Sequence, residues 1–147
     1  MSDWLGMIEL CDVCATARTR NLELFATLGE WIRSTPDGDR QRLYAEACHR
    51  HAWHAELWAA RAPTLPRSAH DRRAAAQPDP EPHPAAVDED DRHGWYTATL
   101  TGLRDELATL GARIDATLDP STARTIQLVA ADLADLTDRA ERAGPAN

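Results

Sequence analysis

Residues 62–91, APTLPRSAHDRRAAAQPDPEPHPAAVDEDD, decide how the remainder of the chain can fold. The stretch holds six of the nine prolines and almost no large apolar side chain. Such a composition cannot bury a core face and is typical of a long extended connection. A long connection in mid-chain predicts two halves that pack on each other, instead of a row of elements joined only by short turns.

Both sides of this connection show helical periodicity, and no segment alternates as a strand does. Each half contains two such segments. The bounds that we expect for the four helices are about 3–34, 39–62, 93–118 and 121–143.

Short turns separate the helices within each half. Thr35-Pro36-Asp37-Gly38 ends the first helix, and Asp119-Pro120 supplies an N-cap and a first helical residue to the last. The sequence therefore predicts a single all-α domain, an antiparallel four-helix bundle of ferritin-like topology. Its parts are a first hairpin (3–62), a Pro/Ala/Asp-rich linker (63–92) and a second hairpin (93–143) within residues 1–147.

Charge and hydropathy exclude several classes of protein. The formal net charge is −8, and all 16 basic residues are arginine, which argues against a nucleic-acid partner. No apolar run approaches the roughly 20 residues of a membrane span, and the N-terminus lacks the basic region of a secretory signal. We expect a cytoplasmic protein with no nucleic-acid or membrane partner. Its three cysteines should be reduced thiols.

The segment CHRHAWHAELW, residues 48–58, concentrates the side chains that carry chemistry. A helical wheel places His51 and His54 on the inward face of the second helix, together with Tyr44 and Trp58. Glu46 and His49 match the Glu-x-x-His spacing of di-iron sites, but they fall on the outward face, with Trp53. The inward histidine pair is therefore the candidate site.

The first hairpin also predicts which residues face that pair. With the turn centred near residues 36 and 37, residue 51 lies level with about residue 22. We therefore expect Asn21 and Phe25 to approach the histidines, and together with Tyr44 and Trp58 they are the candidate ligand- or cofactor-binding residues. Glu23 lies at the same level but on the polar face, from which a modest rotation would bring it to a helix edge.

Two motifs resemble a known family. Leu22-Glu23-Leu24-Phe25, followed after a turn by His51-Ala52-Trp53-His54-Ala55-Glu56-Leu57-Trp58, is similar to a group of small actinobacterial ferritin-like proteins. The resemblance implies a four-helix bundle with a degenerate di-iron motif. Only Glu23 matches a first-helix glutamate, and the second helix has histidines where a glutamate is expected. The resemblance thus implies that a complete di-iron site is absent.

Three interpretations of His51 and His54 stay open on the sequence. In the first, they are metal ligands of a mononuclear site with Glu23 or a cysteine as the third ligand, and imidazole ligands suit zinc, copper, iron or nickel. Alternatively, they are catalytic acid–base residues in a bundle-core pocket, or bind a ligand there. As a third alternative, they are core residues whose nitrogens hydrogen-bond to Asn21, Tyr44 or water.

The first helix is apolar over a wider arc than one bundle seam requires. One edge of that arc, with Val13, Leu24 and Trp31, predicts a contact with a second copy of the chain or with another protein. The function predicted first is therefore a binding or accessory protein that lacks a complete di-iron site, acting as a homodimer or with a partner. The alternative is an enzyme that uses His51 and His54, with or without a single metal ion.

Overall fold

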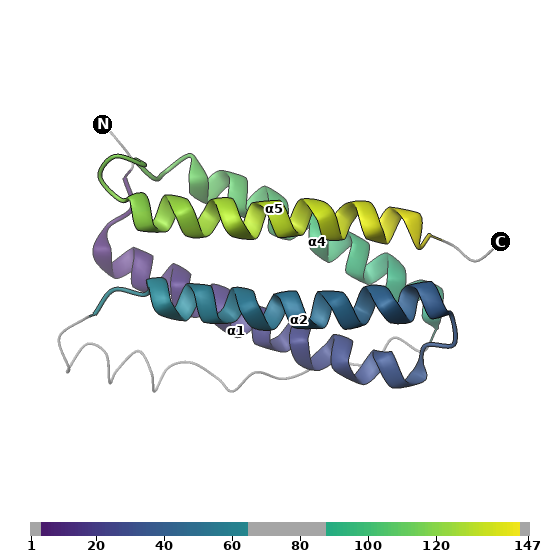
Figure 1. The fold of residues 1–147 in the computed structure, drawn as a ribbon. Helices are drawn as coiled ribbons and strands as arrows, with labels where there is room; N and C mark the ends of the chain where they lie inside the picture. Colours follow the sequence, from purple (N-terminus) through teal and green to yellow (C-terminus); the bar gives the residue numbers. More distant parts are fainter. Residues whose placement is uncertain (1–3, 65–87, 145–147) are drawn as a thin grey trace.

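The computed structural model describes residues 4–64 and 88–144, and every regular element in these two ranges is an α-helix. This confirms the all-α prediction and is consistent with a four-helix bundle (Figure 1). The predicted linker falls largely on residues 65–87, outside the described ranges. The helices are α1 (Met7–Ser34), α2 (Gly38–Arg61), α4 (Glu89–Gly111) and α5 (Pro120–Arg142).

Aspartate side chains begin three of these helices. Asp37 accepts hydrogen bonds from two backbone amides at the start of α2. Asp119 caps α5 as predicted, and Pro120 is the first residue of that helix. Asp88 caps α4 in the same way, so α4 begins at Glu89 and not at the predicted His93. The acidic run that follows Asp88 is helical because carboxylates are favourable beside the amides of a helix N-terminus.

The second helix of each hairpin runs antiparallel to its neighbour across the bundle. Arg40, at the start of α2, donates to the backbone carbonyl oxygens of Ala143 and Gly144 after the end of α5. Arg61, at the other end of α2, donates to both carboxylate oxygens of Asp119, at 2.9 and 3.0 Å. These bonds at both ends of α2 fix its register against α5.

The first helix of each hairpin is likewise antiparallel to its counterpart. Arg92, near the start of α4, donates to the hydroxyl of Ser34 at the end of α1. Arg113, just after α4, donates to both carboxylate oxygens of Glu9 near the start of α1. As a result, α2 ends and α4 begins at opposite ends of the molecule (Figure 1).

The inward face of α1 differs from the one expected. Trp31 is 1% exposed and Leu24 is 3% exposed, so the predicted partner contact through these two residues is wrong. Phe25, expected in the core, is 44% exposed. The observed seam alternates steps of four and three residues, the spacing of a helix that packs along its whole length. Its members are Leu10, Cys14, Ala17, Asn21, Leu24, Leu28 and Trp31.

Aromatic rings fill the end of the core near the α1–α2 turn. Trp31 makes edge-to-face contacts with Tyr44 from α2 and Trp95 from α4, at centroid distances of 5.7 and 5.5 Å. Tyr44 contacts Tyr96 in the same way at 6.2 Å. Such pairs contribute about 0.5–1.5 kcal/mol beyond their buried area. This cluster therefore joins both hairpins and explains why Trp31 is a core residue.

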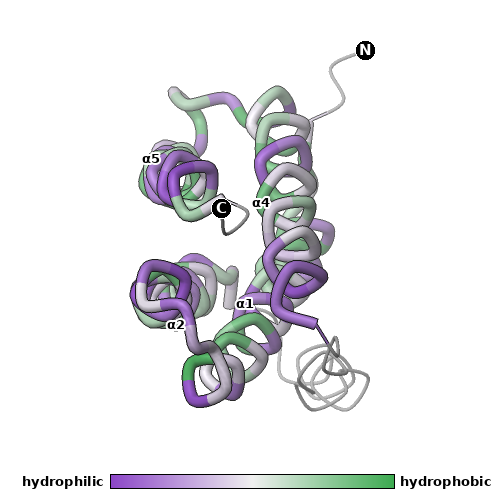
Figure 2. Tube along the Cα trace, turned by 90° about the vertical axis from the view of Figure 1, so that its right-hand side faces the viewer, coloured by the Kyte–Doolittle hydropathy of each residue, from purple (hydrophilic) through white to green (hydrophobic). Residues whose placement is uncertain are grey.

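The other end of the bundle is more open. The closest helix pairs are α1–α2, α4–α5 and α2–α5, whereas α1 and α4 stand further apart. In Figure 2, α2 and α5 are seen nearly end-on, while α1 and α4 run obliquely beside them. Residues of both α1 and α4 line the cavity at the candidate site.

Candidate functional site

Both candidate histidines lie where the wheel of α2 predicted. His51 and His54 are fully buried, one helical turn apart, and their rings meet at right angles with centroids 5.7 Å apart. Trp58, one turn further along, is also buried. The inward face of α2 is thus predicted correctly from the spacing of its residues.

Both ring nitrogens of His51 have protein partners. Nδ1 lies 2.8 Å from the side-chain oxygen of Asn21, and Nε2 lies 3.1 Å from the hydroxyl of Tyr96. The amide nitrogen of Asn21 donates to the carbonyl oxygen of Ala17, so its oxygen is the atom that faces His51. Nδ1 therefore carries the proton, and Nε2 accepts from Tyr96.

This arrangement makes His51 a neutral residue of the core. Burial lowers its pKa from 6.5 to about 3, and the neighbouring His54 adds to the shift. A metal ion at His51 would have to displace either Asn21 or Tyr96. In the structure, His51 therefore fits the third interpretation, a satisfied core histidine, with Asn21 as one of the expected partners and Tyr96 in place of Tyr44 or water.

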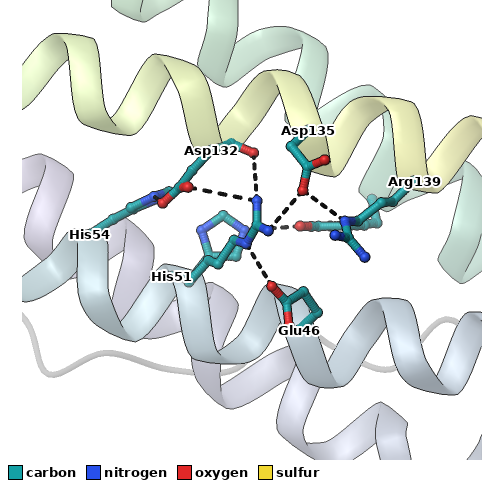
Figure 3. Close-up of polar contacts among 8 residues, drawn as sticks. Glu46, His51, His54, Asp132, Asp135 and Arg139 are labelled. Carbon is teal, nitrogen blue, oxygen red and sulfur yellow. Dashed lines mark hydrogen bonds and ion pairs between the residues drawn. The ribbon is translucent and has the colours of Figure 1, made fainter.

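His54 has a partner on one side only. Its Nε2 lies 2.8 Å from the carboxylate of Asp132 on α5 (Figure 3). Its Nδ1 is buried and has no hydrogen-bond partner among the residues that the structure describes. A buried polar atom without a partner costs about 1–3 kcal/mol, so this nitrogen stands out against the satisfied His51.

Asp132 is itself fixed in position. Arg50 of α2 lies 3.6 Å from its carboxylate and donates to its backbone oxygen at 3.4 Å. The same guanidinium is paired with Asp135 at 2.7 Å and with Glu46 at 2.8 Å. Figure 3 shows these acids around the histidine pair, with Asp135 also bonded to Arg139. The carboxylate that orients His54 is therefore part of a network between α2 and α5.

Electrostatics leave His54 neutral as well. Burial lowers its pKa below 6.5, and the hydrogen bond and charge of Asp132 oppose that shift without reversing it. An ionised carboxylate can only accept hydrogen bonds, so Nε2 of His54 carries the proton. The remaining lone pair is on Nδ1, which the surrounding side chains shield from solvent.

A cavity of about 380 Å³ adjoins this histidine. All four helices contribute to its walls, and His54, Asn21 and Trp58 form part of its inner surface. The remaining inner walls are mostly aliphatic, with Val13 and Ala17 from α1 facing α4 and α5. Pockets of this size accommodate small organic molecules. The aliphatic residues from α4 and α5 are Leu103, Leu107, Leu110, Val129 and Leu133.

Charged pairs border the same cavity between α1 and α4. Arg20 donates to both carboxylate oxygens of Glu106, at 2.7 and 2.8 Å. Glu9, one of the lining residues, is paired with Arg113, whose hydrogen bond holds the pKa of Glu9 below its usual value. The cavity therefore has an apolar interior, a polar histidine wall and a charged border.

The other predicted site residues have mixed positions. Asn21 and Trp58 line the cavity, whereas Tyr44 is buried in the aromatic cluster and Phe25 lies on the surface. Phe25 was placed wrongly because the apolar arc of α1 is too wide for a wheel to show which part faces inward. Glu23 is half-buried and is not among the lining residues. Within the described ranges, no three His, Cys, Asp or Glu residues are arranged to hold a metal ion.

Two functional residues were missed from the sequence. Tyr96 was not among the predicted site residues, although its hydroxyl bonds to His51. Asp132 was also not among the predicted site residues, although it bonds to His54. A signal was available, because Asp132 lies three residues after Val129 and four before Leu136, both buried. That spacing puts Asp132 at the edge of the stripe, within reach of α2.

Comparisons with known proteins supply no relative from which a function could be inferred, so the inference is made from the geometry of the site. No family model, curated protein sequence or solved structure gave a significant match to the chain. Among the helices that the structure describes, none combines the length and apolarity needed to cross a bilayer.

Proposed function

We propose that this chain is a small-molecule-binding protein of ferritin-like topology that lacks a complete di-iron site. Its ligand would occupy the cavity between α1 and α4. The observation that supports this proposal best is the cavity of about 380 Å³, whose walls come from all four helices and are mostly aliphatic.

The chemistry of the cavity walls agrees with binding. Ligand sites are mostly apolar, with a small number of polar groups that orient the ligand. Here aliphatic side chains from α1, α4 and α5 form the walls, and His54 and Asn21 supply the buried polar groups. Both polar groups are held in place by other side chains or by backbone, so their orientation is set before a ligand enters.

The His54–Asp132 pair favours a second function, an enzyme in which His54 acts as a general base. A carboxylate that holds a neutral imidazole in one tautomer is the arrangement by which enzymes prepare histidine to take a proton. In that case the substrate would have to displace the side chains that cover Nδ1 before giving it a proton, and Asp132 would stabilise the imidazolium that forms. Asp132→Asn would then lower turnover far more than it lowers affinity.

A cavity-filling substitution tests the proposed binding function. Ala17 lines the cavity, so Ala17→Phe should block it, while Ala108→Phe places the same ring on the exposed face of α4. Saturation-transfer NMR with a library of small aromatic and alicyclic compounds provides the measurement. We expect compounds that bind the native chain and the Ala108→Phe variant but not the Ala17→Phe variant. Binding that persists in Ala17→Phe, or no binding to the native chain, would contradict the proposal.

A further inference from the structure

We propose that a second site, at the end of the bundle where α2 begins and α5 ends, binds a small phosphate-bearing anion. A depression of about 380 Å³ lies between these two helix ends and shares no lining residue with the cavity beside His54. Three of the residues that line it are arginines. The lining residues are Asp39, Arg42, Leu43, Arg139, Arg142 and Ala143. The inference is independent of the function proposed for the cavity.

The three arginines give this depression a charge opposite to that of the whole chain. The formal net charge of the protein is −8, whereas the residues that line the depression carry three positive charges and one negative charge, that of Asp39. Guanidinium groups that share one small depression repel one another. An anion placed among them would offset this repulsion, so the depression is complementary to a ligand with more than one negative charge.

Most hydrogen-bond donors of these arginines are not used within the described part of the protein. A guanidinium group has five N–H donors. Arg142 makes no ion pair or hydrogen bond with any residue that the structure describes. Arg42 uses Nη2 for the carboxylate of Asp39. Arg139 uses Nε for the carboxylate of Asp135 (Figure 3). The remaining donors can bind the oxygens of a ligand.

The two existing ion pairs can give way to a ligand because they are exposed to solvent. The side chains of Arg42 and Asp39 are 78% and 74% exposed, and those of Arg139 and Asp135 are 46% and 41% exposed. Exposed pairs of this kind contribute little to stability. A dianion in the depression would therefore compete with each carboxylate for its arginine at little cost.

The two helix ends that carry the arginines are joined beside the depression. The buried Arg40 of α2 donates to the carbonyl oxygens of Ala143 and Gly144 after the end of α5. This contact fixes the spacing of the two helix ends. It also occupies two carbonyl oxygens that would otherwise repel an anion at the end of α5. The backbone positions of the arginines are thus set before a ligand arrives.

A phosphate group fits this set of donors. The planar fork of arginine matches the oxygens of phosphate, and a phosphate monoester near neutral pH carries close to two negative charges. A nucleic acid does not fit, because the remainder of the chain has an excess of negative charge that would repel a long polyanion. The ligand is therefore small. Inorganic phosphate and a small phosphate monoester both present the same dianionic group.

Titration with inorganic phosphate and with phenyl phosphate tests the proposal on the full chain. Binding would be followed by ¹H–¹⁵N NMR at pH 7.5 and constant ionic strength. We expect saturable shifts at the amides of Arg42 and Arg142, and a dissociation constant that rises about three- to tenfold in Arg42→Met and in Arg142→Met. Arg124→Met removes the same charge from an exposed position near the start of α5, so it should bind as the native chain does.

A further variant covers the case in which Arg142→Met does not fold. Arg142→Lys keeps the charge but loses the planar fork, so the dissociation constant should still rise. Tighter binding of phenyl phosphate would identify a monoester as the ligand, and equal or weaker binding would identify free phosphate. Shifts that do not saturate in the native chain, or an equal loss of affinity in Arg124→Met and Arg142→Met, would overturn the proposal.

Discussion

Two buried tyrosines test whether the His51 network stabilises the fold. Tyr96 and Tyr44 are both fully buried and lie in edge-to-face contact with each other. The hydroxyl of Tyr96 donates to Nε2 of His51, whereas the hydroxyl of Tyr44 is buried and has no hydrogen-bond partner within residues 4–64 and 88–144. Substitution of either residue by phenylalanine removes one oxygen and keeps the ring. The two variants therefore differ mainly in the hydrogen bond that is lost.

The expected magnitudes follow from these contacts. Tyr96→Phe leaves the lone pair of His51 Nε2 buried with no donor, which should lower the free energy of unfolding by about 1–3 kcal/mol. Tyr44→Phe removes a hydroxyl that already lacks a partner, so it should change stability by less than about 0.5 kcal/mol or increase it. Burial raises the pKa of Tyr44 to about 12, as expected for a hydroxyl away from water.

Urea denaturation followed by circular dichroism at 222 nm measures both variants against the native chain. The same denaturant slope in all three proteins would show that the unfolding transition is comparable. The reasoning is refuted if Tyr44→Phe is as destabilising as Tyr96→Phe, or if Tyr96→Phe has no effect. Either result would mean that His51 is not held by the hydrogen bond described.

Three further predictions concern stability. Arg40 is 2% exposed and donates to the carbonyl oxygens of Ala143 and Gly144. Arg40→Met should therefore lower the free energy of unfolding, measured in urea, by about 1.5–3 kcal/mol. As a control, Arg42→Met removes an exposed pair with Asp39 and should change the free energy of unfolding by less than about 1 kcal/mol. Gly94 and Gly102 lie within α4, and an added Cβ would meet nothing within 4 Å at either position. Each Gly→Ala substitution should therefore raise the free energy of unfolding by about 0.5–1 kcal/mol. A lower free energy of unfolding in both variants would mean that these positions are more crowded than the structure shows. Folding lowers the pKa of His51 from 6.5 to about 3. Between these two pH values the unfolded chain therefore binds a proton at His51 that the folded chain does not bind. Stability should therefore be fully present above pH 6.5 and decrease below it, by up to about 1.4 kcal/mol per pH unit for this residue, with a further decrease from His54, whose pKa is also lowered. Urea denaturation curves of the native chain at pH 7 and pH 5 provide the measurement, and His49→Gln, which changes an exposed histidine, is the control. Identical curves at the two pH values would contradict the prediction.

The fold was predictable to the extent that the sequence carries unambiguous periodicity. The apolar residues of α2 are few and lie on one face, which also carries His51, His54 and Trp58. A single orientation of the helix therefore buries that face. The apolar arc of α1 is much wider, and several rotations about its axis would bury a similar area. Packing against α2 and α4 selects the rotation that buries Trp31, and a single helix considered alone contains no information on that choice.

The candidate site was predictable only in its α2 half. The pair of inward histidines followed from spacing within one helix. Asp132 belongs to α5, and its contact with His54 depends on the register between α2 and α5. That register is set by Arg40 and Arg61 at the two ends of α2. Contacts of this kind join residues about 60–100 positions apart, and periodicity within a helix does not reveal them.

The most direct test of the account is the protonation of the His54 ring in solution. Long-range ¹H–¹⁵N correlation spectra of the ¹⁵N-labelled chain at neutral pH, compared with spectra of His54→Leu to assign the signals, report which ring nitrogen carries the proton. The account predicts a neutral ring with the proton on Nε2, where it is donated to Asp132. A proton on Nδ1, or a charged imidazolium at neutral pH, would contradict it.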